Sequence, residues 1–289
     1  MATREQRVCA VTGANGYVGS RIVRALSAAG WTTIALGRHG AQVPYDLEEG
    51  TAPGALARCG ARALVHVAYD FSERTWDRIH AVNVEGTQRL LDAARAEGVQ
   101  RIVYISSTAA FEGCRSMYGR AKLETEAIAR SAGAFIVRPG LVCGDRPGGM
   151  VGTLLGLLRR SPVVPLIGSG RTPIHTVHED DLCALVAHLL EGGADSAGLA
   201  GHAITAASEK SIEFRAMLQL FADHERRRVT WAPLPWQLVW LGVKALEIAH
   251  VPSGLRSDSV VSFVNADPHP DFTYTRRAGV SFRPFSIVA

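Results

Sequence analysis

The sequence lacks the cysteine patterns that define several specialised classes of protein. It contains five cysteines, which are scattered along the chain, and none of them forms a Cys-x-x-Cys pair. An odd, dispersed set argues against a disulfide framework or a zinc site and favours a reducing compartment. There is also no internal repeat and no low-complexity segment, so solenoids and compositionally biased tracts are excluded.

Long apolar runs are equally scarce. Residues 1–7 lack the apolar core of a signal peptide, so we expect no secretory leader. The most apolar later stretch, residues 234–251, is interrupted by Lys244 and Glu247 and falls short of the ~20 apolar residues that a membrane span needs. We therefore predict a cytoplasmic protein with no membrane span. We interpret residues 234–251 as a buried or groove-lining helix, with a helix on a membrane surface as the alternative.

A strong excess of one charge is absent as well. The 289 residues include 31 Lys and Arg against 27 Asp and Glu. The basic clusters at residues 226–228 and 276–277 have no interleaved aromatic residues, which favours solvated surface over a nucleic-acid site. A hydrophobic content of 47% and a charged content of 20% are typical of a globular protein.

Apolar runs rich in β-branched residues alternate with helical patterns along most of the chain. We expect strands at residues 8–11, 32–36, 43–47, 63–68, 101–106, 135–137 and 202–206. We expect one helix directly after the first strand and further helices over residues 76–97, 118–132 and 151–160. We expect another helix to begin at a cap formed by Asp180 and Asp181. This alternation predicts βαβ units with right-handed crossovers, and so a doubly wound parallel sheet of the Rossmann type in the α/β class.

The regular alternation of strand and helix patterns ends beyond Gly144, where a glycine- and proline-rich loop begins. We predict that residues 1–145 and 174–206 form the nucleotide-binding domain. Residues 146–173 and 207–289 would form a smaller substrate-binding domain. In open parallel sheets the ligand lies at the carboxyl ends of the strands, so the smaller domain is expected to close a cleft there.

The first chemical signal is the glycine-rich stretch Thr12-Gly13-Ala14-Asn15-Gly16-Tyr17-Val18-Gly19, directly after the first expected strand. A tight turn here leads into a helix, whose free N–H groups and positive dipole end form an anion site. The pyrophosphate of a dinucleotide is the usual occupant. By itself the stretch is also compatible with an ordinary strand-to-helix turn.

A second signal is a pair of residues four apart, Tyr118 and Lys122, which a helix places on one face. We expect the lysine ammonium to lower the pKa of the phenol toward neutrality. Ser107 and Thr108 follow the preceding strand, where a cofactor ring is expected. Such groups suit proton transfer at a carbinol oxygen while a hydride moves to or from a nicotinamide.

In this order, the motifs resemble those of the extended short-chain dehydrogenases/reductases, the NAD-dependent epimerase/dehydratase group. The glycine stretch matches the Thr-Gly-x-x-Gly-x-x-Gly loop of that family, and Tyr118-Gly119-Arg120-Ala121-Lys122 matches its Tyr-x-x-x-Lys pair. Asn83-Val84-Glu85-Gly86-Thr87, Arg138-Pro139-Gly140-Leu141-Val142-Cys143-Gly144 and Val177-His178-Glu179-Asp180-Asp181-Leu182 resemble three further family segments. The resemblance covers nearly the whole chain.

The resemblance implies roles for individual residues. Tyr118 would be the general acid/base, and Lys122 would hold the ribose hydroxyls and tune Tyr118. The hydroxyl partner would be Thr108, with Ser107 as second choice, and Asn83 would kink its helix and hold a water molecule. No metal ligand is expected. The residues implied to contact the cofactor are Gly13, Asn15, Gly16, Tyr17, Val18, Gly19, Arg38, Asp46, Leu47, Val67, Ala68, Tyr69, Asn83, Ser106, Tyr118, Lys122, Pro139, Gly140 and Val142.

The choice of cofactor depends on the end of the second expected strand. Enzymes that bind NAD place an acidic residue there to accept the ribose hydroxyls. Gly37 occupies that position and Arg38 follows it, so a guanidinium is available to pair with a 2′-phosphate. We predict that NADP(H) is preferred, with NAD(H) as the alternative cofactor and stacking on adenine as the alternative role for Arg38.

Departures from the family pattern bear on the substrate. Ile174 stands where sugar-nucleotide enzymes of the family carry a diphosphate-binding arginine, and Ala109-Ala110 stand where dehydratases carry Asp-Glu. These departures favour an oxidoreductase acting on the carbonyl or secondary alcohol of a small molecule. A nucleotide-sugar epimerase or dehydratase with transient internal hydride transfer is the alternative, and a non-catalytic dinucleotide sensor is a third hypothesis. We expect no nucleic-acid partner, and the resemblance suggests a homodimer.

Overall fold

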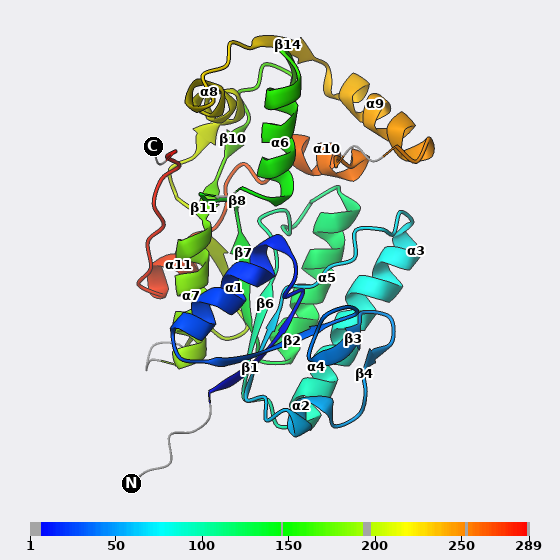
Figure 1. Ribbon diagram of the computed structural model, residues 1–289, viewed down its shortest axis with the longest axis vertical. Coiled ribbons are helices and arrows are strands. Elements are labelled where there is room, and N and C mark those ends of the chain that lie inside the picture. Colours follow the sequence, from blue (N-terminus) through cyan, green and yellow to red (C-terminus); the bar gives the residue numbers. More distant parts are fainter. Residues whose placement is uncertain (1–6, 146, 193–197, 252–253, 288–289) are drawn as a thin grey trace.

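The computed structural model of the protein describes residues 7–145, 147–192, 198–251 and 254–287. Its centre is an eight-stranded sheet with the order β12-β7-β6-β5-β1-β2-β3-β4 (Figure 1). Neighbouring strands of this sheet run parallel, except that β3 and β4 are antiparallel. The strands are β1 (Val8–Thr12), β2 (Thr32–Gly37), β3 (Val43–Asp46), β4 (Gly50–Thr51), β5 (Ala63–His66), β6 (Arg101–Ile105), β7 (Phe135–Pro139) and β12 (Ala203–Ala206). The predicted doubly wound parallel sheet is therefore confirmed, and every strand expected from the sequence is present in it.

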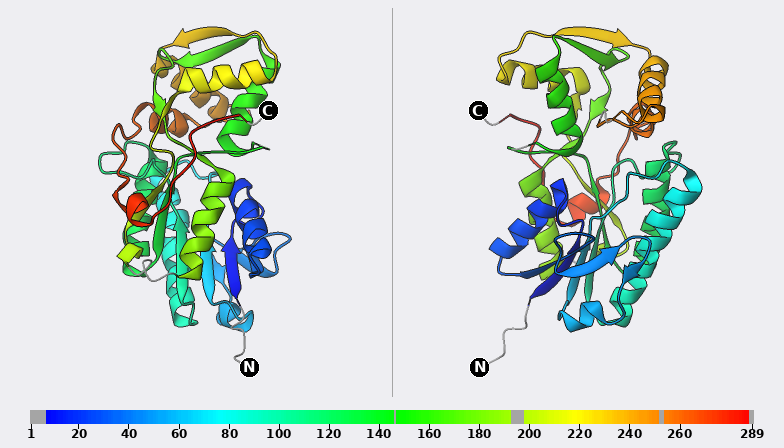
Figure 2. Two further views of the ribbon diagram at one scale, coloured as in Figure 1. Left: turned by 90° about the vertical axis from the view of Figure 1, so that its left-hand side faces the viewer. Right: turned by 45° about the vertical axis from the view of Figure 1, so that its right-hand side comes forward.

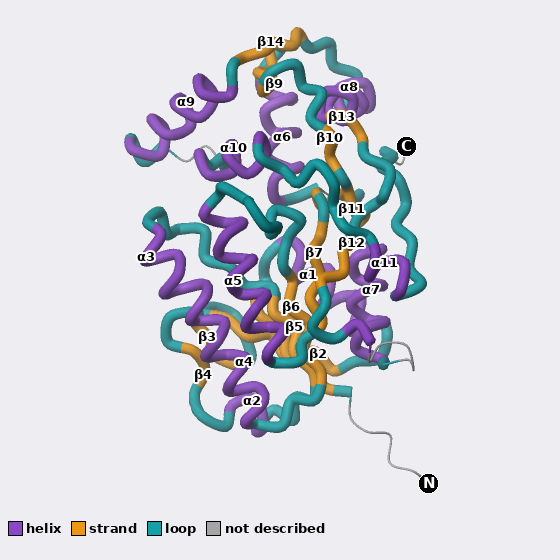
Figure 3. The backbone as a smooth tube through the Cα atoms, turned by 180° about the vertical axis from the view of Figure 1, so that it is seen from behind, coloured by secondary structure: helices purple, strands orange, loops and turns teal. Residues whose placement is uncertain are grey.

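Helices cover both faces of the sheet, as Figures 2 and 3 show. Side chains of successive strand residues point to opposite faces. Cys9 and Val11 accordingly belong to the apolar core under α1 and α7, whereas Ala10 belongs to the core under α4. The covering helices are α1 (Tyr17–Ala28), α2 (Ala55–Arg58), α4 (Gly86–Ala96), α5 (Met117–Ser131) and α7 (Glu179–Glu191).

The helical pattern over residues 76–97 does not form one regular helix. It comprises α3 (Trp76–Ile79), the π-helix η1 (His80–Glu85) and α4, which follow one another without a break. A π-turn is the usual sign of a functional constraint inside a helix. The buried Asn83 lies within it, at the residue for which the resemblance implied a kink.

A second apolar core lies beyond the carboxyl ends of the strands, at the top of Figure 1. It includes Leu158, Val164, Leu166, Met217 and Leu218. The domain boundaries drawn from the sequence stay a prediction. The elements of this region are α6 (Gly149–Arg160), β9 (Val163–Ile167), β13 (Ile212–Glu213), α8 (Phe214–His224), β14 (Thr230–Leu234), α9 (Trp236–Ile248) and α10 (Ser257–Val264). Short strands β8 (Leu141–Cys143), β10 (Pro173–Ile174) and β11 (Thr176–His178) connect it to the sheet, and α11 (Thr273–Arg277) packs beside β12.

Two local expectations were wrong. The helix α9 is not a buried helix, because Val243 is its one buried residue among those the structure describes. Leu238, Leu241 and Ile248 are exposed, and a groove-lining or membrane-surface role for the helix stays a prediction. The helix α7 is capped by His178, whose Nδ1 accepts a hydrogen bond from Asp180 N at 3.2 Å, rather than by Asp180 or Asp181. Those two carboxylates lie in the first turn, where they complement the helix dipole.

No helix among the described residues is long and apolar enough to cross a membrane. Two expectations concern residues that the structure does not describe. The N-terminal segment, residues 1–6, lies outside the described residues, as does Arg146, the first residue of the predicted smaller domain.

Candidate active site

The glycine turn connects β1 to α1 at the carboxyl edge of the sheet. Gly13 has a φ of +65°, and its carbonyl accepts a hydrogen bond from Gly16 N at 2.9 Å. A Cβ added to Gly13 would lie 3.0 Å from Ala68 N, and one added to Gly19 would collide with Gly13 O. The turn is therefore held close to its neighbours at the first turn of α1, with the geometry that a pyrophosphate requires. The residues fit a dinucleotide at this position.

A buried chain of hydrogen bonds supports this turn from below. Thr12 Oγ1 lies 2.7 Å from His66 Nδ1, and His66 Nε2 lies 2.9 Å from Thr87 Oγ1. Thr87 Oγ1 donates to the carbonyl of Asn83 at 2.6 Å, so it accepts from His66 Nε2. This direction assigns the neutral Nε2–H tautomer. Burial lowers the pKa of His66 to about 3 and so keeps the ring neutral.

The same chain fixes the loop that follows β5. Thr12 Oγ1 accepts hydrogen bonds from the N–H groups of Val67 and Ala68 at 3.1 and 3.2 Å. Asn83 pairs with the backbone of Asp70 through both side-chain atoms, at 2.7 and 3.1 Å. Residues 67–70 are thus positioned between the glycine turn and the π-helix. His66 is a residue that the sequence reasoning missed, although it lies within the strand expected at residues 63–68 and ends β5 beside this turn.

Tyr118 and Lys122 lie on one face of α5, as the spacing predicted. The Tyr118 phenol forms a hydrogen bond with the side chain of Ser107. The buried Lys122 Nζ donates to Ile105 O at 2.8 Å and lies 6.0 Å from the Tyr118 ring centroid. The backbone N–H of Thr108 donates to Pro139 O at 3.0 Å. Ser107, the second choice of the sequence, is thus the hydroxyl found beside the phenol, and the role of the Thr108 hydroxyl stays a prediction.

The electrostatics of this pair differ from the expectation. Burial raises the pKa of Tyr118 above its ordinary value, and the hydrogen bond with Ser107 opposes that rise. Burial also lowers the pKa of Lys122 to about 7, against the opposing effect of Glu126. The expectation that Lys122 lowers the Tyr118 pKa toward neutrality was wrong, because burial dominates and the lysine is itself only partly charged near pH 7. The phenol is protonated at neutral pH.

Two aromatic side chains from the loop after β5 surround the Tyr118 ring. Tyr69 meets it edge-on, with ring centroids 5.0 Å apart, and Phe71 stacks on it at 5.6 Å. The Phe71 side chain is 54% exposed. Tyr69 was an expected cofactor contact, whereas Phe71 was missed. Phe71 follows β5 by a few residues, at the carboxyl edge of the sheet, and this position is the signal that could have identified it.

The N-terminus of α5 is capped by Ser116, whose Oγ accepts a hydrogen bond from Gly119 N at 3.0 Å, and also by a residue remote in the sequence. Asp258 of α10 accepts hydrogen bonds from Met117 N at 2.9 Å and from Tyr118 N at 3.0 Å. A carboxylate at this position satisfies two free N–H groups and complements the helix dipole. Asp258 therefore fixes the backbone that carries Tyr118. Nothing in the local sequence of α10 identified it.

A buried ion pair lies one helical turn beyond Lys122. Arg138 binds both oxygens of Glu126, at 2.8 and 2.7 Å, and Ser106 Oγ donates to the same carboxylate at 2.6 Å. Glu126 is 1% exposed. The hydroxyl of Ser106, an expected cofactor contact, is thus engaged by Glu126. A contact between Ser106 and a cofactor stays a prediction that would involve its backbone.

The candidate specificity residue Arg38 lies just beyond the end of β2. Its guanidinium is 65% exposed and lies 3.8 Å from Asp46 Oδ2 and 3.9 Å from Asp70 Oδ2. Asn15 Nδ2 donates to His39 O at 3.0 Å and ties the glycine turn to the same loop. Arg38, Asn15 and Asp46 are therefore close together, as the sequence expected of cofactor contacts.

The remaining expected cofactor contacts are distributed around this edge. Leu47 is buried, and its carbonyl accepts from Arg89 Nη2 at 3.1 Å. Pro139 ends β7, and a Cβ on Gly140 would collide with His175 O. Val18 and Val142 pack against the core under α1 and α7. The Tyr17 ring lies against Gly148 and 4.5 Å from the Arg21 guanidinium.

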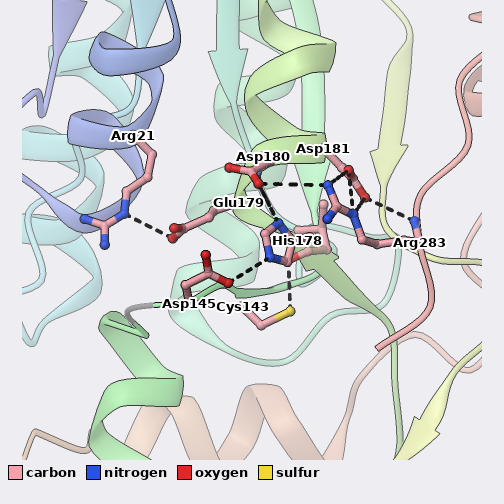
Figure 4. A network of polar contacts seen from close by, with 9 residues as sticks. Arg21, Cys143, Asp145, His178, Glu179, Asp180, Asp181 and Arg283 are labelled. Carbon is pink, nitrogen blue, oxygen red and sulfur yellow. Dashed lines mark hydrogen bonds and ion pairs between the residues drawn. The ribbon is translucent and has the colours of Figure 1, made fainter. Parts of the chain in front are cut away.

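A separate polar network joins α7 to β8, β11 and the C-terminal segment (Figure 4). His178 Nε2 lies 3.9 Å from Asp145 Oδ1, and Arg21 Nε donates to Glu179 at 3.0 Å. Arg283 binds Asp181 through Nε and Nη2, at 2.9 and 2.6 Å. These contacts hold the C-terminal segment against the sheet and explain the structural role of the segment around His178.

A hollow of about 460 Å³ lies in the second core region. Leu166, Ser169, Arg171, Arg215, Trp231 and Pro233 line it. Arg171 thus faces this hollow, three residues away from Ile174. The side chain of Ile174 packs partly buried on the apolar core of the same region. The place of the diphosphate-binding arginine is therefore taken by an apolar contact.

The geometry at Tyr118 leads to a test of the two hydroxyls. Ser107→Ala is expected to lower kcat by about 10²-fold, because it removes a donor at the position where negative charge develops on oxygen. Thr108→Ala is expected to lower kcat by less than about tenfold. Turnover of the two purified variants provides the comparison. A larger loss in Thr108→Ala would reverse this assignment.

Comparisons with known proteins agree with this geometry. The profile of the NAD dependent epimerase/dehydratase family matches residues 9–201. The ceramide reductase of Caulobacter vibrioides is 37% identical over 197 residues, which cover 64% of this chain and 61% of that protein. The chain thus spans about three fifths of the length of that relative.

Two further proteins extend the comparison. A 4-hydroxy-2-methyl-3-oxo-4-farnesyl-3,4-dihydroquinoline-1-oxide ketoreductase of Stigmatella aurantiaca is 26% identical over 259 residues, 78% of this chain and 76% of that protein. The structure of RMD from Pseudomonas aeruginosa complexed with NADPH is similar in fold, with a TM-score of 0.63 and 21% identity over 79% of this chain and 87% of that one.

Proposed function

Because the chain belongs to the NAD dependent epimerase/dehydratase family, we propose that it is an oxidoreductase that interconverts a carbonyl group and a secondary alcohol. The family uses a nicotinamide cofactor, and we propose that NADP(H) is preferred here. Tyr118 acts as the general acid/base, with Ser107 and Lys122 as its partners. The glycine turn after β1 holds the pyrophosphate.

The observation that carries this proposal is the placement of Tyr118 and Lys122 on one face of α5, with Lys122 Nζ 6.0 Å from the Tyr118 ring centroid. When bound, the reduced nicotinamide supplies a hydride to the carbonyl carbon. Tyr118 gives its proton to the carbonyl oxygen, and the Ser107 hydroxyl hydrogen-bonds that oxygen as charge develops on it. Reduction takes one proton from Tyr118, and solvent restores that proton before the next turnover.

Substrate class is proposed from the surroundings of Tyr118. Its ring is flanked by Tyr69 and by the exposed Phe71. The apolar packing of Ile174 leaves no cation at the position that holds a sugar-nucleotide diphosphate in this family. The names of two relatives, a ceramide reductase and a farnesyl-quinoline ketoreductase, both include lipophilic compounds. These features support a lipophilic carbonyl compound as the substrate.

A cofactor-turnover assay tests the proposal. The purified protein is incubated either with NADPH and a lipophilic ketone in detergent or with NADP+ or NAD+ and a UDP-hexose, and the absorbance of the reduced cofactor and the product are both followed. Net consumption of NADPH with the ketone supports the oxidoreductase. Conversion of the UDP-hexose without net consumption would instead support the epimerase or dehydratase, and cofactor binding without product would support a sensor.

The preference for NADP(H) rests on Arg38, whose guanidinium is 65% exposed beyond the end of β2. Arg38→Ala is expected to raise KM for NADPH by about tenfold, because it removes a charge-assisted hydrogen bond to the 2′-phosphate. KM for NADH should change by less than about twofold. Steady-state kinetics with both cofactors measure the ratio. A wild-type preference for NADH would refute this assignment.

A further inference from the structure

The helix α9 presents an uncharged apolar surface to solvent. Leu238, Leu241 and Ile248 are 56%, 58% and 69% exposed. They share the outer side of the helix with Gly242, Ala245 and Ala249, which are exposed as well. Figures 1 and 3 show α9 at the periphery of the molecule. A surface helix of a globular protein normally carries polar and charged residues on this side, so the outer face of α9 is fitted to an apolar partner.

The charges of α9 and α10 do not interrupt this face. Glu247, the acid of α9, has a side chain only 10% exposed and binds Ser257 through both oxygens, at 2.9 and 2.8 Å. Asp258, the acid of α10, is engaged at the N-terminus of α5. The rim carries two basic residues: the exposed Arg74, and Lys244, whose side chain is 39% exposed and whose Nζ lies 3.6 Å from Glu247 Oε2. An uncharged apolar face with basic residues at its margin is complementary to an anionic lipid surface.

The loop beside Tyr118 is tied to this helix. Arg74 Nη1 donates to Glu247 O at 2.7 Å, and Arg256 Nη2 donates to Glu73 O at 2.8 Å. The same loop carries the exposed Phe71, which stacks on Tyr118. The loop that carries Phe71 and Arg74 therefore contacts both α9 and the ring of Tyr118.

A second copy of the chain is a weaker occupant of this face. A helix of 13 residues is about 20 Å long and about 10 Å wide, which gives about 200 Å² of contact. A stable protein interface needs about 800 Å² from each partner. The helix is also too short to span a bilayer. A helix that lies in the membrane surface requires only that its apolar side chains enter the headgroup boundary.

We propose that the outer face of α9 docks on an anionic membrane surface and that a lipophilic substrate reaches Tyr118 from there past Phe71. The docking step is independent of the chemistry, whereas the route of the substrate rests on the proposed function.

Flotation with vesicles tests the docking without cofactor or substrate. The full chain is mixed with phosphatidylcholine vesicles that contain phosphatidylglycerol, or with pure phosphatidylcholine vesicles. The double variant Leu241→Glu/Ile248→Glu is compared with the matched control Leu220→Glu, which alters an exposed leucine of α8 (43% exposed). The wild type and the control should float with the anionic vesicles, and the double variant should lose binding by about tenfold or more.

Two further measurements keep the test decisive. The variant Leu241→Trp carries an indole on the outer face, and its fluorescence should shift to the blue with anionic vesicles by more than that of the wild type. This readout stands even if the double variant does not fold. Light scattering after size exclusion shows whether α9 joins two copies. The docking proposal is overturned if the wild type binds neither vesicle type or if the double variant binds as well as the control. It is also overturned if the only effect of the double substitution is to convert a dimer to monomers.

The vesicle-binding and activity measurements distinguish failure of the docking proposal from failure of the proposed function. Vesicle binding without any carbonyl reduction would leave the docking intact and remove the proposed function. Reduction of a lipophilic ketone in detergent by a protein that does not bind vesicles would support the function and overturn the docking.

Discussion

Tyr118→Phe is expected to lower kcat for carbonyl reduction by about 10³-fold, because a phenyl ring cannot donate a proton to the substrate oxygen. The substitution removes one hydroxyl and keeps the ring, whose edge contact with Tyr69 and stacking on Phe71 hold it in place. Affinity for NADPH should change little, since the proposed pyrophosphate site is the glycine turn. Single-turnover kinetics and NADPH fluorescence measure the two quantities separately.

A matched control for this variant is Tyr45→Phe. Tyr45 is a buried tyrosine of β3 whose hydroxyl has no hydrogen-bond partner among the described residues. Its loss should leave kcat within about twofold of the wild type. If Tyr118→Phe retained most of its activity, the proton would have to come from another group and the assignment of the general acid would be wrong.

Glu126→Gln is expected to lower the free energy of unfolding by about 3 kcal/mol, because it leaves the Arg138 guanidinium without its carboxylate in a largely buried position. The Arg138 side chain retains 20% exposure, which tempers the cost relative to a fully buried pair. Denaturant titration measures the change. Glu124→Gln, on the solvent side of the same helix with a side chain 43% exposed, should cost less than about 0.5 kcal/mol.

The same variant should alter the pH dependence of activity. Burial lowers the pKa of Lys122 to about 7, and the negative charge of Glu126 is what raises it. Removing that charge removes a stabilising influence on the ammonium, so the pKa of Lys122 falls further. The limb of the kcat/KM profile that reports Lys122 in the free enzyme should therefore move from near pH 7 to lower pH. A limb that does not move would exclude Glu126 as a positioning residue for the Lys122 charge.

Patterns of local sequence determined the framework of this protein. Strand periodicity placed Cys9 and Val11 on one face of the sheet and Ala10 on the other. The glycine stretch formed the tight turn into α1, and the four-residue spacing put Tyr118 and Lys122 on one face of α5. These features follow from a period of two in strands and 3.6 in helices, so neighbouring residues are enough to specify them.

Contacts between remote elements decided the rest. Asp258 lies 140 positions from Tyr118 in the chain and still caps its helix. The local sequence offered both Ser107 and Thr108 as hydroxyl partners, but the path of the chain beyond β6 brings Ser107 to the phenol. The direction of the Tyr118 pKa shift also depended on burial, which is a property of the assembled site.

The helix α9 illustrates the same division most clearly. Its composition predicted an apolar helix, and a helix over Trp236–Ile248 is present. Whether such a helix is buried depends on what the fold packs against it, and here α10 covers the side that holds Val243 while the opposite side stays uncovered. The sequence by itself determined the sheet, the glycine turn and the spacing of Tyr118 and Lys122, because short-range periodicity encodes them. Only the tertiary structure decided which hydroxyl meets Tyr118, which charges surround Lys122 and which apolar face remains in solvent, because each depends on elements that are distant in the chain.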